Sequence, residues 1–454
     1  MTISRVLIAN RGEIALRIIR ACQELGIETV LATSEADRDS LPARLADRAI
    51  CIGPARSAQS YLNHRAIVTA AIGAGADAIH PGYGFLAESP DLAEASASNG
   101  ITFVGPTADH MRRMGNKIQA RLLAREAGVP TLAGSEKIGS PQEALAVAER
   151  VGFPVILKAA AGGGGRGMKV VTSARNLEQT FTAASAEAGS AFGDPTLYIE
   201  RYISNARHIE VQILGDRFGN VVHVGERDCS LQRRHQKIVE EAPAPSIAEN
   251  LREEIRNAAV KLARNINYEN AGTAEFIYDE DEKRFYFLEM NTRIQVEHPV
   301  SETISGIDLV QEQFRIADGQ PLRVAQPDIV FRGHSIECRI NAEIPEDGFR
   351  ANAGLIEEWA PPVGPNIRID THCYAGYRVP IFYDSMLAKL IVYGSTRGEA
   401  VQRMKRSLER FVVTGVGTTI PFLHFMMQRE EFASGAVTTH LIEDVMPQFS
   451  GSSR

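Results

Sequence analysis

Cysteine is scarce in this sequence, and long hydrophobic runs are missing. The five cysteines include no CxxC pair, so neither a zinc site nor a disulfide framework is indicated. They are Cys22, Cys51, Cys229, Cys338 and Cys373. No stretch approaches the roughly 20 apolar residues of a membrane-spanning helix, and the apolar run before Asn10 is too short for a signal peptide. We therefore expect reduced thiols in a soluble, cytoplasmic protein.

An excess of positive charge is missing as well. The 454 residues carry 49 Lys and Arg against 56 Asp and Glu, a formal net charge of −7. A nucleic-acid partner would require a basic face to hold the phosphate backbone, and an anionic membrane would require a polybasic segment. The composition therefore argues against both kinds of partner. The length predicts about three domains.

The N-terminal part alternates short apolar runs with helical patterns. Strands are expected at 6–9, 29–32 and 78–80, and helices at 13–25 and 66–73. This alternation predicts an open parallel sheet, which binds ligands beyond the carboxyl ends of its strands. Those ends carry Asn10-Arg11-Gly12 and the segment from His80 to Gly84. The region lacks a GxGxxG motif, which argues against a nicotinamide-dependent oxidoreductase.

The rest of the chain predicts a different architecture. A helix is expected at 116–127, then a compact unit with a helix at 141–151 and strands at 155–158, 168–172 and 197–202. Residues 208–287 are typical of antiparallel strands, and 331–446 alternate strands with a basic helix at 397–410. We expect a multidomain α/β and α+β protein. The expected boundaries are 1–114, 115–330 with a lid at 136–203, 331–446, and a tail at 447–454.

A glycine-rich loop, AGGGGRGM at 161–168, follows the expected strand VILK. Successive glycines let backbone N–H groups approach phosphate oxygens without side-chain obstruction. No GK[ST] opens a helix here, and a strand follows the loop, so it resembles a hairpin flap rather than a Walker P-loop. Lys158 at the strand end favours phosphate binding, since its ammonium can pair with phosphate. A plain surface loop is the alternative.

Two glutamates are expected to face each other across a hairpin. If the charged turn at 279–283 centres near 282, Glu275 and Glu289 are both seven residues away and opposed. Opposed carboxylates repel, and a bound cation relieves the repulsion. Oxygen ligands of this kind suit Mg²⁺. Two glutamates on a wet sheet face are the alternative, but the neighbouring residues are apolar.

The segment EMNTRIQVE at 289–297 alternates polar and less polar residues without a break. An extended strand over these nine residues would put Glu289, Asn291, Arg293, Gln295 and Glu297 on one face. That face would offer metal ligands, then a guanidinium, an amide and a carboxylate. A basic cluster (Arg233, Arg234, His235 and Lys237) precedes it in the chain and would supply cations for an anion.

These segments together resemble one family, the biotin carboxylases of the ATP-grasp superfamily. The strings that carry the resemblance are IANRGEIALRI, HPGYGFLAE, MGNK, KAAAGGGGRGM, ERDCSLQRRHQK, FLEMNTRIQVEHPV, ECRINAE and YDSMLAKL. They span residues 3 to about 446. Other ATP-grasp ligases, such as carbamoyl-phosphate synthesis enzymes, share the flap and paired glutamates but not the QRRHQK and RIQVEHPV strings together.

The resemblance implies a Rossmann-like N-terminal domain, an ATP-grasp core with a mobile glycine lid, and a mixed C-terminal domain. It implies that ATP phosphates contact Lys117 and Lys158 under Gly163, Gly164 and Gly165. Adenine would meet Glu200, Arg201 and Ile203, and the ribose and phosphates would meet His208, Gln232 and His235. Two Mg²⁺ or Mn²⁺ ions would be held by Glu275, Glu289 and Asn291. Bicarbonate would be bound by Lys237, Arg293, Gln295 and Val296. Glu297 would be the base, Arg339 would stabilise the biotin enolate, and Tyr83 and Arg17 would lie near biotin or its path.

The resemblance also implies partners. The sequence shows no AMKM-type biotin attachment site, so biotin would arrive on a biotin carboxyl carrier protein, and a carboxyltransferase would choose the acceptor. Acetyl-CoA carboxylase, in fatty acid synthesis, is the expected system, with a pyruvate- or propionyl-CoA-type carboxylase as the alternative. A homodimer is expected from the family.

Three positions depart from the family pattern. They are Ala160-Ala161 in the flap, Arg201 where lysine is frequent, and 351–354 where a proline-containing turn is usual.

Overall fold

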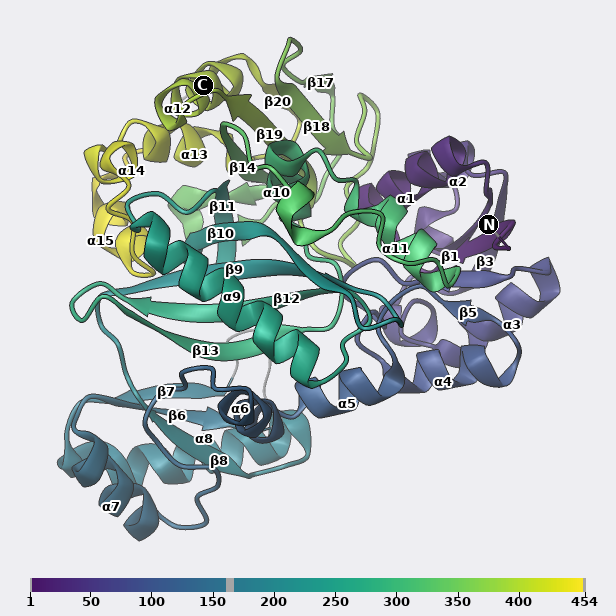
Figure 1. Ribbon diagram of the computed structural model, residues 1–454. Coiled ribbons are helices and arrows are strands. Elements are labelled where there is room, and N and C mark those ends of the chain that lie inside the picture. Colours follow the sequence, from purple (N-terminus) through teal and green to yellow (C-terminus); the bar gives the residue numbers. More distant parts are fainter. Residues whose placement is uncertain (1, 161–166, 452–454) are drawn as a thin grey trace.

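The computed structural model describes residues 2–160 and 167–451 (Figure 1). The N-terminal part contains a parallel sheet in the order β3-β2-β1-β4-β5. Its strands are β1 (Arg5–Ile8), β2 (Glu28–Ser34), β3 (Arg48–Gly53), β4 (Ala78–His80) and β5 (Thr102–Phe103). Its helices are α1 (Gly12–Leu25), α2 (Leu41–Leu45), α3 (His64–Ala74), α4 (Pro90–Ser98) and α5 (Ala108–Gly115), with short 3-10 turns at Glu35–Asp37 and Ser57–Gln59. The predicted open parallel α/β sheet is confirmed.

The carboxyl ends of β1 and β4 meet, as expected for parallel neighbours. Asn10 Nδ2 donates to the carbonyl oxygens of Pro81 at 2.6 Å and Tyr83 at 2.7 Å. Gly12 begins α1 with a φ of +66°, a left-handed conformation that glycine adopts without strain. The chain therefore turns sharply from β1 into α1 and brings the two predicted ligand-binding loops together.

The lid region is a small sheet packed on helices, at the lower left of Figure 1. Its strands, in the antiparallel order β7-β6-β8, are β6 (Val155–Ala159), β7 (Met168–Val171) and β8 (Leu197–Arg201). The lid helices are α7 (Pro141–Val151) and α8 (Leu177–Phe192), with a 3-10 turn at Ala174–Asn176, whereas α6 (Lys117–Glu126) precedes the lid and packs against β13. Helix α8 was not predicted, because much of its buried side is alanine and gives little hydrophobic periodicity. The predicted flap residues Gly163, Gly164 and Gly165 lie outside the described residues.

The central sheet runs in the order β13-β12-β9-β10-β11-β14-β19-β18. Its strands are β9 (Ala206–Gly215), β10 (Val221–Arg233), β11 (Gln236–Ala242), β12 (Asn270–Asp279), β13 (Arg284–Asn291), β14 (His334–Asn341), β18 (Ile367–Thr371) and β19 (Met386–Gly394). Pairing of β11 with β14 carries the sheet across the boundary expected near residue 330. The antiparallel strands were predicted, but helix α9 (Glu249–Asn265), which covers one face in Figure 1, was not.

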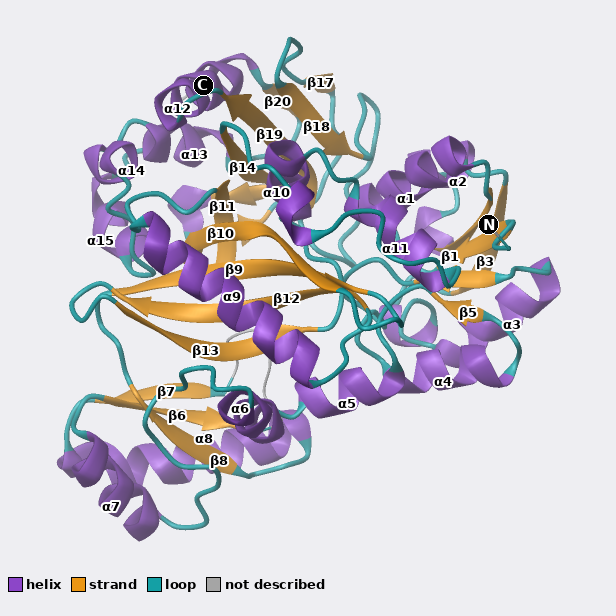
Figure 2. Ribbon diagram, in the orientation of Figure 1, coloured by secondary structure: helices purple, strands orange, loops and turns teal. Residues whose placement is uncertain are grey.

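The C-terminal part packs helices against β14 and β19 (Figure 2). The helices that do so are α10 (His298–Ser305), α12 (Arg397–Arg410) and α13 (Ile420–Met427). Helix α11 (Leu309–Ala317) instead packs against α1 and β12, α14 (Glu430–Ser434) packs against α13, and α15 (Leu441–Val445) packs against β10. Short strands are β15 (Glu343–Ile344), β16 (Arg350–Ala351), β17 (Glu358–Ala360) and β20 (Val412–Thr414), with 3-10 turns at Gln326–Asp328, Pro345–Asp347 and Met446–Gln448. Helix α12 has the predicted bounds.

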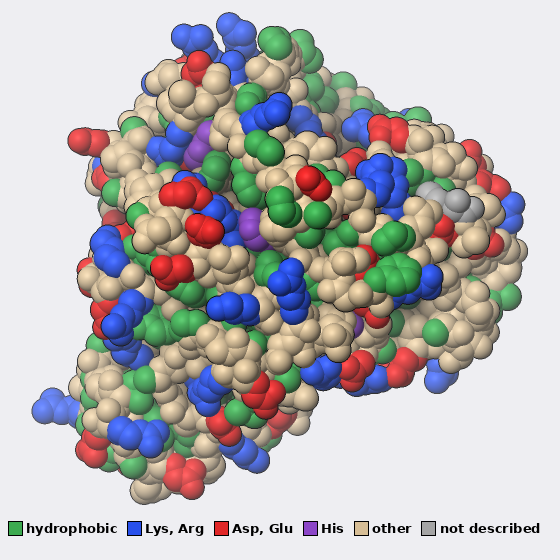
Figure 3. Space-filling model, viewed as in Figure 1, with side chains coloured by type: hydrophobic (Ala, Val, Ile, Leu, Met, Phe, Trp, Pro, Cys, Tyr) green, Lys and Arg blue, Asp and Glu red, His purple; other side chains and the backbone are tan. Residues whose placement is uncertain are grey.

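Acidic and basic side chains are interspersed over the face shown in Figure 3, in line with the small net charge. Within the described ranges, every helix is either too short or too polar to cross a bilayer. The five cysteines are free, and Cys51 alone among them is exposed. The expectation of unpaired thiols is confirmed.

Candidate active site

A row of three glutamates crosses the central sheet from β13 to β9. Glu289 is paired with Glu275, and Glu275 is paired with Glu210 on the next strand. The opposition of Glu275 and Glu289 was predicted, but it does not arise from a turn centred near residue 282. Near the turn Phe276 pairs with Phe287, and a register shift between Glu275 and Phe276 then brings Glu275 opposite Glu289. Without that bulge Glu275 would face Leu288.

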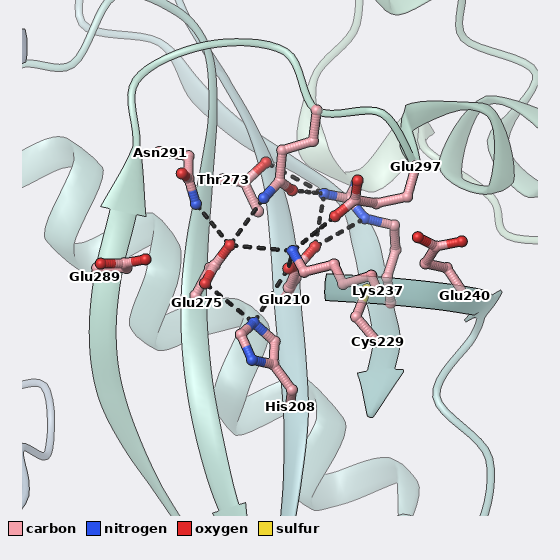
Figure 4. Close-up of polar contacts among 12 residues, drawn as sticks. His208, Glu210, Cys229, Lys237, Glu240, Thr273, Glu275, Glu289, Asn291 and Glu297 are labelled. Atoms are coloured by element: carbon pink, nitrogen blue, oxygen red, sulfur yellow. Dashed lines mark hydrogen bonds and ion pairs between the residues drawn. The ribbon is translucent and has the colours of Figure 1, made fainter. Parts of the chain in front are cut away.

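Cations and amides compensate the repulsion along this row (Figure 4). Glu275 accepts from Asn291 Nδ2 at 2.6 Å and from Gln295 Nε2 at 2.8 Å, and it pairs with His208 at 3.0 Å. Burial by itself would raise the pKa of Glu275, but Lys237 and then protonated His208 hold it well below its ordinary value. The pKa of His208 is raised to about 10, because its carboxylate partners outweigh the desolvation.

Lys237 contacts three carboxylates of the site. Its ammonium contacts Glu210, lies 3.2 Å from Glu275 and lies 2.7 Å from Glu297. Burial opposes the charge, yet these three carboxylates raise the pKa of Lys237 well above its usual value. The side chains of His208, Glu210 and Glu275 come close enough to hold a metal ion, but the Lys237 ammonium contacts two of them. Lys237 is therefore charged and fills that position.

A second guanidinium continues the arrangement. Arg339 on β14 contacts Glu240 on β11, with Nε 2.6 Å from Oε1, and reaches Glu297 with Nη2 at 2.9 Å. Glu297 itself begins helix α10 as the N-cap residue. We call Lys237, Glu297, Arg339 and Glu240 the ion-pair row. Glu297 stays ionised, since Lys237 and Arg339 lower its pKa against the effect of burial and of Glu210.

The strict alternation predicted for 289–297 holds only in its first part. Strand β13 ends at Asn291, and the following residues form a turn into α10. Burial alternates from Asn291 to Ile294, but Gln295 is buried like Ile294 and Val296 is half-buried, so the alternation breaks at Gln295. The prediction of one extended strand was therefore wrong. Asn291 and Gln295 still converge on Glu275, because the turn redirects the second of them.

Arg293 and Val296 lie around the same turn. Arg293 Nε donates to Glu88 at 3.0 Å, and its Nη2 donates to Asn291 Oδ1 at 3.1 Å. The carbonyl oxygen of Val296 accepts from Lys389 Nζ at 2.9 Å. The structure thus brings these predicted residues next to the ion-pair row.

Two further pairs lie near the boundary between the lid and the central sheet, one on each side of it. Lys117, the first residue of α6, pairs with Glu289. Lys158 on β6 lies 2.6 Å from Glu200 on β8, which also pairs with Arg121 at 3.1 Å. We call Lys117–Glu289 and Lys158–Glu200 the lid-side pairs. They place both predicted phosphate lysines at the edge of the glutamate row.

The remaining predicted nucleotide residues surround these pairs. Arg201 is bound by Asp279 at 3.0 Å and by Glu282 at 2.5 Å, and Ile203 is buried. Gln232 is buried and donates to the Cys229 carbonyl at 3.2 Å. His235 has a φ of +65° in the tight turn between β10 and β11, and burial lowers its pKa.

The two predicted biotin residues are separated. Tyr83 donates to Glu13, which pairs with Lys389 at 3.2 Å, so it connects to the Val296 carbonyl. It also lines a cavity of about 330 Å³ together with Asn10, Arg11, His372, Phe382 and Asp384. Arg17 instead pairs with Glu302 at 2.9 Å and Asp308 at 2.7 Å. The structure does not bring Arg17 into the ion-pair row.

Sequence reasoning missed several residues of the site. Arg227 is fully buried and donates to Gln212 at 2.9 Å and Gln295 at 2.6 Å, and it pairs with Glu210 at 3.3 Å. Glu210 and Glu240 were missed as well. Charged residues inside otherwise apolar strands, as in RHIEV and KIVEE, were the signal that could have found them.

Family models match nearly the whole chain. They are "Biotin carboxylase, N-terminal domain" at residues 2–111, "Carbamoyl-phosphate synthase L chain, ATP binding domain" at 116–325, and "Biotin carboxylase C-terminal domain" at 337–444. Biotin carboxylase 1 of Bacillus subtilis is 52% identical over 447 residues, covering 98% of this chain and 99% of that protein. A pyruvate carboxylase subunit of Methanothermobacter thermautotrophicus is 51% identical, covering 97% of this chain and 90% of that protein.

A solved structure agrees over the full length. It is the biotin carboxylase domain dimer of Hydrogenobacter thermophilus 2-oxoglutarate carboxylase, in complex with MgADP, ADP and bicarbonate. The TM-score is 0.96 at 46% identity, with 100% of both chains covered. The identity far exceeds what fold similarity alone would require. This chain belongs to the biotin carboxylase family, ATP-dependent ligases that form a carbon–nitrogen bond.

Proposed function

We propose that this protein carboxylates biotin on a biotin carboxyl carrier protein, using ATP and bicarbonate through carboxyphosphate, as the first half-reaction of a biotin-dependent carboxylase. The observation that carries the proposal is the position of Glu297 between Lys237 at 2.7 Å and Arg339 at 2.9 Å. Two cations beside a carboxylate can hold a small anion, while the carboxylate accepts the proton of that anion. The buried surroundings strengthen each of these electrostatic contacts.

In the proposed reaction Glu297 removes the proton of bicarbonate while a bicarbonate oxygen attacks the γ-phosphorus of ATP and ADP leaves. Bicarbonate is a poor nucleophile, so this proton removal is the contribution expected of a general base. Lys237, Arg293, Gln295 and the Val296 backbone would hold the anion. Carboxyphosphate then breaks down to CO₂ and phosphate next to biotin. The released phosphate would accept the proton of the ureido nitrogen of biotin, and that nitrogen would then form a bond to CO₂. Arg339 would stabilise the enolate oxygen that develops when the ureido nitrogen loses its proton.

The lid-side pairs would serve ATP. Lys117 and Lys158 would exchange Glu289 and Glu200 for phosphate oxygens, with the loop containing Gly163, Gly164 and Gly165 over them. Adenine would contact Glu200, Arg201 and Ile203, and the ribose and phosphates would contact His208, Gln232 and His235. The pairing of Glu200 with Lys158, and the proximity of Lys158 to His235, whose pKa it helps to lower, support this assignment.

The opposed carboxylates Glu275 and Glu289, with Asn291, fit a pair of hard divalent ions such as Mg²⁺ or Mn²⁺. Like charges directly opposite across a ladder destabilise it, and a cation between them removes that cost. When bound, the metal would neutralise charge on the transferred phosphoryl group.

Biotin would approach Arg339 past Tyr83. The cavity of about 330 Å³ beside Tyr83 supports this path, and Arg17 would act at a distance from it. The carrier protein and a carboxyltransferase are the proposed partners, and acetyl-CoA carboxylase is the proposed system. A pyruvate-type system is the second candidate, because a pyruvate carboxylase subunit is 51% identical to this chain. A homodimer, like the Hydrogenobacter thermophilus domain dimer, is part of the proposal.

The test is ADP release with Mg²⁺, in the presence and absence of bicarbonate and free biotin. Bicarbonate-dependent ADP release that biotin stimulates is the expected result. Turnover that requires ammonia or an amino acid instead would replace biotin carboxylation with another ATP-grasp reaction.

A second experiment identifies the acceptor system. Purified carrier domains from acetyl-CoA and pyruvate carboxylases are offered separately with radiolabelled bicarbonate, and label transfer to each carrier is counted. The acetyl-CoA carboxylase carrier is expected to be labelled faster. Preference for the pyruvate carboxylase carrier would favour the second candidate.

A further inference from the structure

Two buried glutamates oppose each other behind Arg339. Glu240 on β11 pairs directly with Glu337 on β14, and neither side chain is exposed. Opposed cross-strand side chains have Cβ atoms about 4.5–5.5 Å apart, so two ionised carboxylates here would repel strongly. Unlike Glu275 and Glu289, this pair lies away from the residues proposed to hold metal or ATP. Some feature other than a bound metal or nucleotide must therefore relieve the repulsion between the carboxyl groups of Glu240 and Glu337.

The polar contacts of the two carboxyl groups are unequal. Glu240 Oε1 accepts a hydrogen bond from Arg339 Nε at 2.6 Å and forms an ion pair with Nη2 at 2.5 Å. The other oxygen of Glu240 and both oxygens of Glu337 have no hydrogen-bond partner among the residues that the structure describes. A buried ionised carboxylate without partners is very costly, whereas a protonated one is not. Glu337 is therefore the member that carries a proton.

The charged groups around the pair also indicate that Glu337, rather than Glu240, carries the proton. Burial raises the pKa of Glu337 well above its ordinary value, more than Lys389 lowers it. Burial and Glu297 raise the pKa of Glu240 to about 7, against the opposing effect of Arg339. The titratable and charged groups that face the pair are Arg339, Glu297, Lys237, Lys389, Cys229 and Cys338.

We propose that Glu240 is the positioning carboxylate of Arg339, and that Glu337 is a neutral acid whose O–H is donated to the free oxygen of Glu240. The inference rests on the proposed function, in which Glu297 accepts a proton. When Glu297 becomes neutral, Arg339 loses one of its two counter-ions. Glu240 remains ionised and keeps the guanidinium in place for biotin. Glu337 contributes a hydrogen bond without adding a charge.

This arrangement has a defined pH dependence. Glu240 is ionised above about pH 7 and becomes neutral below it. Arg339 then loses Glu240 as a counter-ion, so biotin-stimulated turnover falls as the pH drops through that range. A hydrogen bond to the ionised form of a carboxyl lowers its pKa. Loss of the Glu337 donor should therefore raise the pKa of Glu240. The acid limb of the pH–rate profile, where turnover falls as the pH drops, should then move to higher pH.

The test compares Glu240→Gln, Glu337→Gln and Glu337→Leu in the full-length protein. Glu240→Gln should lower kcat/KM for free biotin by about 10- to 100-fold, because small misplacements of a catalytic group have effects of this size. Glu337→Gln keeps a donor and should stay within a few-fold of wild type, with its acid limb unmoved. Glu337→Leu keeps the volume but removes the donor, and its limb should shift to higher pH.

Several outcomes would overturn the inference. Glu240→Gln with wild-type kcat/KM would remove the positioning role. A limb that moves to lower pH in Glu337→Gln would mean that Glu337 is ionised in the wild type. Infrared difference spectra give a readout independent of activity: well above the pKa of Glu240, a protonated-carboxyl C=O band should persist in the wild type and disappear in Glu337→Gln. Thermal melts verify that each variant is folded. If wild type itself shows no biotin-stimulated turnover, the proposed function fails, and the infrared band still tests the protonation of Glu337.

Discussion

The lid-side pairs and the ion-pair row neutralise similar charges in different ways. Lys117 and Lys158 each pair with one carboxylate, Glu289 on the central sheet and Glu200 on the lid sheet. In the ion-pair row Lys237 is shared by three carboxylates, and Glu297 is shared by two cations. A single pair can be exchanged for a ligand one partner at a time. A shared network cannot lose one member without leaving several charges uncompensated.

The difference matches the chemistry proposed for each region. ATP has to enter and ADP has to leave, so its lysines should release their protein partners readily. The bicarbonate proton must pass to a base whose position does not change, so that base should be held from two sides. Substitutions in the ion-pair row should therefore affect chemistry and stability most, and substitutions in the lid-side pairs should affect nucleotide binding.

The largest effect is expected from Glu297→Ala. Loss of a general base lowers a rate by about 10²–10⁴-fold, so bicarbonate-dependent ADP release should almost disappear. ATP binding measured by calorimetry should change little, because Glu297 does not contact the lid-side pairs. Glu253→Ala, an exposed residue on α9, is the matched control. Unchanged turnover in Glu297→Ala would contradict the assignment of the base.

Lys237→Met should show the largest loss of stability. Breaking a buried ion pair by removing one partner costs about 3–5 kcal/mol, because the remaining charges stay buried. Here Glu210, Glu275 and Glu297 all lose a partner. The control is Lys169→Met, whose pair with Glu187 is 43% and 49% exposed and should contribute less than about 1 kcal/mol. If urea unfolding gave equal free energies of unfolding for Lys237→Met and Lys169→Met, the buried network would contribute no more stability than an exposed pair, contrary to this prediction.

Glu200→Gln should have a smaller effect that depends on pH. Burial by itself would raise the pKa of Glu200, but Lys158 and Arg121 hold it below the ordinary value. Such a carboxylate stabilises the fold above its unfolded pKa of about 4.3, and the contribution is lost as the pH falls further. The variant should lose about 1–3 kcal/mol at neutral pH. Its deficit against wild type, from urea unfolding, should shrink below about pH 4. A deficit that is constant with pH would contradict this.

Local sequence patterns predicted the elements well where one period dominates. The parallel N-terminal sheet and helix α12 followed from such patterns. The Glu275–Glu289 opposition was predicted by counting from the turn, but it depends on a β-bulge that the count did not include. Helix α8 was missed because alanine-rich faces give weak periodicity. The extended strand to Glu297 failed because a turn beginning after Asn291 preserves the convergence of side chains but not their alternation.

Contacts between distant strands could not be predicted in this way. Glu210 lies between Arg227 and Glu275 because β9 pairs with β10 on one side and β12 on the other. Glu240 reaches Arg339 only because β11 pairs with β14 from the C-terminal part. The registers of these pairings depend on packing of the whole sheet. A single sequence therefore identified the segments that form the candidate site, but not the partners that fix the charges of their side chains.

The smallest effect, expected from Glu289→Gln, concerns a residue that belongs to both regions. Glu289 pairs with Lys117 on the lid side and opposes Glu275 across the β-bulge. If it holds a metal, the amide should weaken Mg·ATP binding by about tenfold, about 1.4 kcal/mol. Binding of ATP with the metal chelated should weaken less or improve, since Lys117 is freed for phosphate. Calorimetric titrations in magnesium and in chelator, with Glu253→Gln as the control, separate the two effects. Equal losses in both media would leave Glu289 as a partner of Lys117 and discard it as a metal ligand.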